Sequence, residues 1–196
     1  MKKNLNQNHS FGPRTNENNS ENMKVECGCT THEEKEYLNN FYSLSVDCVF
    51  DCLFNTDSNF YKEYFAANNF FDLRVQNWTD NSRKLEYNFD LGFFCKTKNI
   101  EKQKILKSVK NECFVVETEV SASGPLYADC VTTITKYCIT KELDNKTRLI
   151  VNVRLDYKKK PSWAVLSIIE SKTSSNMKSC YAFIDKKLTS IENKIN

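Results

Sequence analysis

The chain has 196 residues, of which 40% are hydrophobic and 27% are charged, and its formal net charge is +3. This balance is typical of one folded domain with some additional chain, and it excludes a fully disordered protein. The apolar runs are too short to cross a bilayer, no secretory signal is visible, and the small charge does not indicate nucleic-acid binding. We therefore expect a cytoplasmic domain whose nine cysteines are reduced.

The first part of the chain has almost no spaced apolar positions. Residues 1–36 are rich in Asn, Ser, Thr, Glu and Lys, which predicts a disordered leader before a folded domain at residues 37–190. Cys27, Cys29 and His32 are residue types that bind zinc. A structural zinc site needs four ligands, usually in two pairs, and no second pair follows at a suitable spacing. We therefore expect polar-tail thiols here and no metal site.

The first predicted elements are a strand and two short helices. Alternating apolar residues at positions 42–46 predict a half-buried strand. Residues 47–54 have apolar side chains at the spacing of one helical face. Asp57 or Ser58 can cap a second helix, which carries the aromatic side chains of residues 60–65.

The middle of the chain has the period of two that is typical of an antiparallel sheet with one dry face. The strands are predicted at residues 71–76, 84–89, 105–109, 114–120, 131–139 and 148–157, with a hairpin turn at residues 144–146.

A long helix is predicted at the end of the chain. Ser162 follows Pro161 and can cap it, and an apolar stripe then extends from Leu166 to Leu188 at steps of three or four residues. The element order predicts an α+β fold in which a curved antiparallel sheet of about six or seven strands grips this helix. Such a sheet cannot contact one helix everywhere, so we expect an apolar cavity that binds a small hydrophobic ligand.

Several motifs resemble landmarks of the VASt domain family, also called Aster domains, and they occur in the family's order between residues 37 and 188. They are Leu53–Phe60 with Tyr64 and Phe65, Trp78, Arg83–Phe89 around Tyr87, 126–129, Tyr137–Ile139, Arg148–Val151, and Trp163. The family usually has Pro-Tyr-Gly-Asp-x-Phe before the sixth strand, where this chain has Leu126, Ala128 and Val131 in place of the Pro, the Gly and the Phe.

The resemblance implies a START-like helix-grip domain that binds a sterol and transfers it between membranes, typically at endoplasmic reticulum contact sites. Relatives usually add a GRAM domain and a transmembrane helix, neither of which is visible in this sequence. We expect a monomer that contacts anionic membranes peripherally and needs no cofactor.

We expect the sterol to lie among inward-facing side chains, with Tyr87, Tyr127 or Tyr137 as the partner of its hydroxyl. The expected cavity residues are Phe71, Tyr87, Phe89, Phe114, Val116, Tyr127 and Tyr137. The loop at 91–98 matches the family's cavity gate and combines aromatic with basic residues. It predicts a membrane-facing lid formed by Phe93, Phe94, Lys96 and Lys98.

Catalysis is not expected. Both histidines, His9 and His32, fall in the leader, the four glycines form no phosphate-binding loop, and Glu117 and Glu119 fall on a predicted solvated face. Two alternatives stay open beside sterol transfer: an interaction domain whose core is filled by large side chains, and a binder of another lipid such as a phospholipid.

Overall fold

A computed structural model describes residues 23–30, 32, 34–90, 96–124, 128–143, 146–159 and 161–195. Its elements are β1 (Lys35–Tyr42), α1 (Val46–Phe54), α2 (Asn59–Ala67), β2 (Phe70–Val75), β3 (Ser82–Asp90), β4 (Lys96–Val109), β5 (Cys113–Ser123), the 3₁₀ turn η1 (Ala128–Cys130), β6 (Val131–Lys141), β7 (Thr147–Tyr157) and α3 (Trp163–Ile195).

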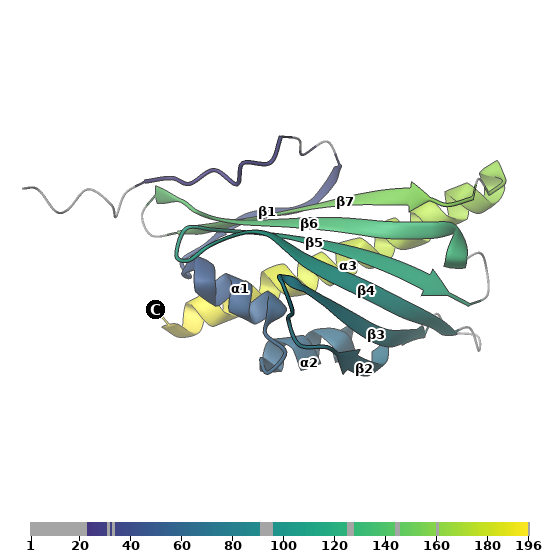
Figure 1. The fold of residues 1–196 in the computed structure, drawn as a ribbon, viewed down its shortest axis with the longest axis horizontal. Coiled ribbons are helices and arrows are strands. Elements are labelled where there is room, and N and C mark those ends of the chain that lie inside the picture. Colours follow the sequence, from purple (N-terminus) through teal and green to yellow (C-terminus); the bar gives the residue numbers. More distant parts are fainter. Residues whose placement is uncertain are drawn as a thin grey trace, which may run out of the picture.

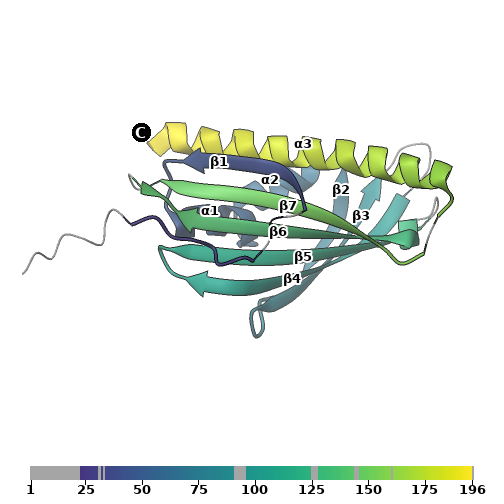
Figure 2. The ribbon, with the colours of Figure 1, turned by 90° about the horizontal axis from the view of Figure 1, so that it is seen from above.

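Within these residues, seven strands form one curved antiparallel sheet in the order β1-β7-β6-β5-β4-β3-β2 (Figure 1). The strands from β2 to β7 follow one another as a meander, while β1 pairs with β7 at the far edge. Helix α3 runs along the sheet on its concave side (Figure 2). The predicted helix-grip fold is confirmed.

The two short helices close one end of the concave side. Helix α1 begins after Ser45, whose hydroxyl accepts the backbone N–H of Cys48 at 3.1 Å. The strand predicted at residues 42–46 is therefore wrong in position, since β1 ends at Tyr42 and Val46 already belongs to α1. On α1, Phe50 stacks on Phe114 of β5 with ring centroids 4.1 Å apart. The main core therefore fills this end of the sheet.

Helix α3 is longer than the predicted apolar stripe. It begins directly after Ser162 and extends through 33 residues. One face of its second half packs in the core, where Ile184 and Leu188 are almost fully enclosed. The described helices include none that is long and apolar enough to span a bilayer.

Part of the predicted leader has a defined place on the sheet. The backbone N–H of Val25 donates to the carbonyl of Lys141 at 2.9 Å, and Lys24 lies 3.4 Å from Glu142. This segment covers Val115, which alternates along β5 with Glu117 and Glu119 of the predicted solvated face and is buried. Residues 1–22 lie outside the described part of the chain.

Candidate functional site

A cavity of about 1010 Å³ lies between the concave side of the sheet and the first half of α3. Its walls come from α1, α2, β2 to β6, η1 and α3. Apolar atoms contribute most of the wall, and a smaller set of polar side chains faces inward from β4 and β6. A hydrophobic wall with few polar groups is typical of a site for a small apolar ligand.

Aromatic side chains form the wall near α2. Phe65 of α2, Phe70 of β2 and Tyr87 of β3 contact one another, with ring centroids 5.0 to 5.3 Å apart. Phe89 extends this group, with its centroid 5.2 Å from that of Phe70. These rings pack at the tilted or edge-to-face angles that aromatic pairs prefer, so they form a well-packed aromatic wall.

A chain of hydrogen bonds crosses the cavity wall between β3 and β4. Nε of Arg83 donates to Gln103 at 2.7 Å, and Nε2 of Gln103 donates to Glu101 at 2.5 Å. The hydroxyl of Tyr87 donates to the other carboxyl oxygen of Glu101 at 3.2 Å. The guanidinium of Arg83 lies over Trp78, 4.4 Å from the ring centroid. The carboxyl of Glu101 is therefore held in position at the cavity surface.

Burial controls the charge of this carboxyl. Removal from bulk solvent raises the pKa of Glu101 above its ordinary value, although hydrogen bonds from Gln103 and Tyr87 and the charge of Arg83 act in the opposite direction. A carboxyl accepts hydrogen bonds in either protonation state, and it also donates one when it is protonated. Such a group is suited to a neutral polar ligand atom such as a hydroxyl.

A second polar group lies on β6 and α3. The hydroxyls of Thr135 and Tyr181 are 3.3 Å apart, and the rings of Tyr137 and Tyr181 pack edge to face at 6.3 Å. Burial raises the pKa of both tyrosines, so they stay neutral. They offer hydroxyl groups without charge.

The predicted cavity residues divide into two groups. Tyr87, Phe89 and Tyr137 line the cavity. Phe114 and Val116 lie on the expected, concave side of β5. They are at the end of the sheet that α1 fills, so both are buried in the core. Tyr127 lies outside the described residues.

Phe71 is displaced from the predicted position by an irregularity in β2. The pairing of β2 with β3 shifts register between Phe71 and Arg74, and Asp72 has a φ of 55°. The bulge turns Phe70 toward the cavity and leaves Phe71 beside Lys96, whose Nζ is 5.0 Å from the ring centroid. A one-residue change in register reverses which side chains face inward.

The predicted lid can be placed only in part. Phe93 and Phe94 lie outside the described residues. Lys96 begins β4 next to the cavity residue Thr97, and Nζ of Lys98 lies 3.6 Å from the carboxylate of Glu86.

The cavity opens beside the start of α3. Ile168 lines the cavity and yet is 62% exposed, and Trp163 at the start of the helix is 85% exposed. These two apolar side chains were not among the expected site residues. Ile168 is therefore an exposed apolar side chain at the cavity wall, and Trp163 is a second exposed apolar side chain at the start of the same helix.

The expected site also missed the inner face of β4. Thr97, Asn99, Glu101 and Gln103 all line the cavity. The sequence does carry a signal for them, because lysines at positions 96, 98, 102 and 104 alternate with these residues. The alternation separates charged from uncharged or buried polar side chains, whereas the prediction relied on apolar residues alone.

A thiol also lines the cavity. Among the described lining residues the one thiol is Cys180, which donates to Asn68 at 3.1 Å. Burial raises its pKa, and a thiol with a raised pKa is a weak nucleophile.

Comparison with protein families gives one match over most of the folded part. The family model described as the VAD1 analog of StAR-related lipid transfer domain, VASt, matches residues 36–176.

Curated relatives include Aster proteins. Aster-B of Mus musculus is 30% identical over 167 residues, which cover 81% of this chain and 22% of that protein, and Aster-B of Homo sapiens gives the same values. Aster-A of Mus musculus is 27% identical over 165 residues, covering 79% of this chain and 23% of that protein. The chain therefore spans less than a quarter of the length of these relatives.

Solved structures share the fold at low identity. The Zhui aromatase/cyclase from Streptomyces sp. R1128 superposes with a TM-score of 0.58 at 11% identity, covering 84% of this chain and 96% of that one. The protein TTHA0849 from Thermus thermophilus gives 0.55 at 10% identity, covering 80% and 99%. At these identities the likeness shows the fold alone.

Proposed function

Because the chain belongs to the VASt family of lipid-binding domains, we propose that it holds one sterol in the cavity and transfers it between membranes. The observation that carries the proposal is the cavity itself. Its volume of about 1010 Å³ is at the upper end of the roughly 300–1,000 Å³ that small-molecule sites occupy. An interaction domain with a filled core would have large side chains in that space, so the open cavity favours a ligand-binding module.

The sterol hydroxyl needs a hydrogen-bond partner inside the cavity. The pair formed by Tyr87 and Glu101 is our candidate, since both groups line the cavity and Gln103 holds the carboxyl in place. A buried hydroxyl left without a partner costs about 1–3 kcal/mol. The aromatic wall then contacts the rigid apolar rings of the ligand.

Transfer requires contact with a membrane near the entrance. Trp163 and Ile168 supply exposed apolar surface there. Lys96 and Lys98 lie at the start of β4, and we propose that they act together with Phe93 and Phe94 of the predicted lid. A tryptophan is well suited to the interfacial region of a bilayer, and lysines favour anionic headgroups. We propose no chemical reaction at this site.

The proposal is tested by titrating the purified chain with a fluorescent sterol. We expect saturable binding of one sterol per chain, and we expect Val120→Trp to abolish it because this side chain faces the cavity from β5. The matched control is Glu119→Trp, on the next residue of the same strand, whose side chain is 44% exposed on the other face. Saturable binding of a phospholipid or a fatty acid without any sterol binding contradicts the proposal, as does sterol binding that survives Val120→Trp.

A further inference from the structure

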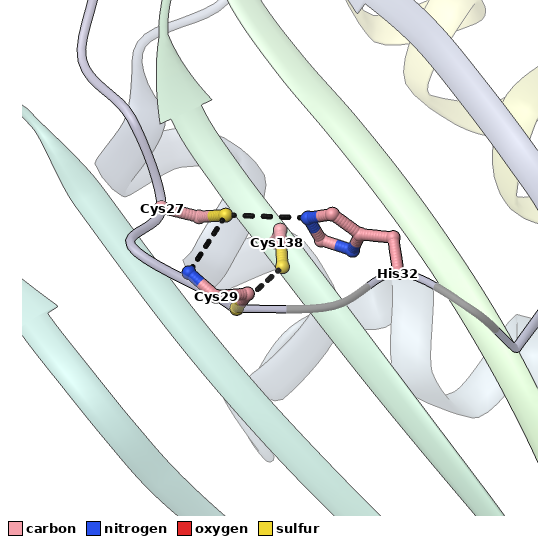
Figure 3. A group of neighbouring side chains, drawn as sticks. All are labelled: Cys27, Cys29, His32 and Cys138. Atoms are coloured by element: carbon pink, nitrogen blue, oxygen red, sulfur yellow. Dashed lines mark hydrogen bonds between the residues drawn. The ribbon is translucent and has the colours of Figure 1, made fainter.

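Three cysteines and one histidine gather on the outer face of the sheet (Figure 3). Cys27, Cys29 and His32 belong to the segment before β1, and Cys138 belongs to β6. Sγ of Cys29 is 3.6 Å from Sγ of Cys138, and Sγ of Cys27 is 3.4 Å from Nε2 of His32. All four atoms lie within 4.8 Å of one another. The adjacent Tyr137 lines the cavity, so Cys138 points away from it.

We propose that these four side chains bind one zinc ion with three sulfur ligands and one nitrogen ligand. In a tetrahedral site with bonds of about 2.3 Å to sulfur and about 2.0 Å to nitrogen, neighbouring ligand atoms are about 3.5–3.8 Å apart. The Cys29–Cys138 and Cys27–His32 distances already agree with this spacing to within about 0.2 Å. The widest separation in the group closes by about 1 Å when a metal binds.

The donor set selects the metal and its role. Thiolates with an imidazole suit zinc, whereas magnesium and calcium prefer oxygen ligands. Four protein ligands leave no open coordination position, so the ion has a structural role and not a catalytic one. The ligation by Nε2 of His32 requires the proton of the neutral ring to be on Nδ1.

The surroundings stabilise a site of this charge. Three thiolates, a neutral imidazole and Zn²⁺ carry a net charge of −1. Lys107 lies beside the site, and its Nζ donates to the carbonyl oxygens of Glu26 and Cys27 at 3.1 and 3.4 Å. The backbone N–H of Cys29 donates to Sγ of Cys27 at 3.4 Å. Such outer hydrogen bonds orient metal ligands and favour the thiolate form.

The site joins a short segment to the folded sheet. The segment is held by the pairing of Val25 with Lys141, by polar contacts of Lys24 and Lys107, and by a small cluster in which Cys113, Val115 and Cys138 are the buried members. The side chains that the segment adds to this cluster, Val25, Cys27 and Cys29, are only partly buried. A metal that binds only when segment and sheet meet adds its binding free energy to folding. The zinc ion would therefore fasten the segment before β1 to the outer face.

The test uses the full chain, purified under reducing conditions, and measures bound metal by elemental mass spectrometry. We expect one zinc per chain, and the absorption spectrum of a tetrahedral thiolate complex when Co²⁺ replaces it. Cys138→Ser should weaken binding by more than the roughly 10–100-fold that loss of an outer-shell partner costs. His32→Ala serves as a second variant, because His32 is exposed and its loss leaves the core intact. Cys48→Ser is the matched control, since Cys48 is a half-buried free thiol on α1.

Thermal unfolding gives an independent measurement. Free Zn²⁺ at about 100 times its Kd should raise the Tm of the chain by on the order of 5–10 °C, and a chelator should reverse this. Three results would overturn the proposal: no bound zinc and no tetrahedral Co²⁺ spectrum, equal metal affinity in Cys138→Ser and the original chain, or a Cys29–Cys138 disulfide in protein kept under reducing conditions.

Discussion

Replacing Glu101 by Gln should change the pH dependence of stability in a direction that the structure fixes. Burial raises the pKa of this carboxyl above its ordinary value of 4.5, and Gln103, Tyr87 and Arg83 offset that effect only in part. Since the folded-state pKa is the higher one, the protonated carboxyl of Glu101 makes its full contribution to the free energy of unfolding below the unfolded-state pKa. This contribution is lost as the pH rises through the folded-state pKa.

The size of the effect follows from the proton balance. Between the two pKa values, the original chain loses up to about 1.4 kcal/mol of stability per pH unit at this site. A glutamine cannot ionise, yet its amide oxygen can still accept the Tyr87 hydroxyl, which donates to Glu101 at 3.2 Å. The new amide NH₂ group at position 101 then faces the donating NH₂ group of Gln103, so one hydrogen bond is lost. This loss costs about 1 kcal/mol and does not depend on pH. The free energy of unfolding of the variant should therefore increase relative to that of the original chain as the pH rises from about 4.5.

Urea unfolding of both proteins between pH 4 and pH 8 measures this difference directly. The difference cancels the titration of every other group that the substitution leaves unchanged. Glu119→Gln, whose side chain is 44% exposed on the outer face, controls for the removal of one charge. A difference that does not vary with pH, or an original chain that gains relative stability as the pH rises, would refute the reasoning.

Other predictions follow from the ends of the chain and from the entrance. Deleting residues 1–22 should leave the Tm unchanged. Deleting residues 1–32 should lower the Tm by several degrees, because the segment on the outer face is lost. Thermal unfolding of the two shortened chains checks both expectations. Trp163→Ser combined with Ile168→Ser should slow sterol transfer between vesicles with little change in Tm, since both side chains are largely exposed. A large fall in Tm would show instead that these side chains pack in the fold. Lys96→Glu should slow transfer to anionic vesicles and not to neutral ones, and added salt should reduce the difference between the two proteins.

The sequence predicts the order of elements well because most of them have clear periods. The helix after Ser162 and the strands around Tyr87 and Leu149 bury one face each, so hydrophobic patterning marks them. The inner face of β4 lacks this pattern, because Asn99 and Gln103 face the cavity in place of apolar residues. A strand that lines a partly polar cavity cannot be recognised by apolar alternation.

Contacts between distant segments limit the prediction of individual site residues. Phe114 has the predicted face, but only the packing of Phe50 shows that α1 covers it. Phe71 leaves the cavity because of a bulge, which no single residue in the sequence announces. Cys138 is one of nine cysteines, and its nearness to Cys29 depends on how a segment more than a hundred residues earlier crosses the sheet. Such pairings are properties of the tertiary structure.

The position of β1 has a consequence for how the chain folds. Tyr42 pairs with Thr147 and Lys35 with Val153, so the first strand must find a partner that is synthesised more than a hundred residues later. Strands β2 to β7 can form hairpin by hairpin, with short loops to close. During synthesis, β1 therefore waits without its partner until β7 is complete, and the core against α3 cannot close before then. Refolding should accordingly show β1 among the last elements to gain protection from hydrogen exchange, and this edge should be where the native sheet first opens.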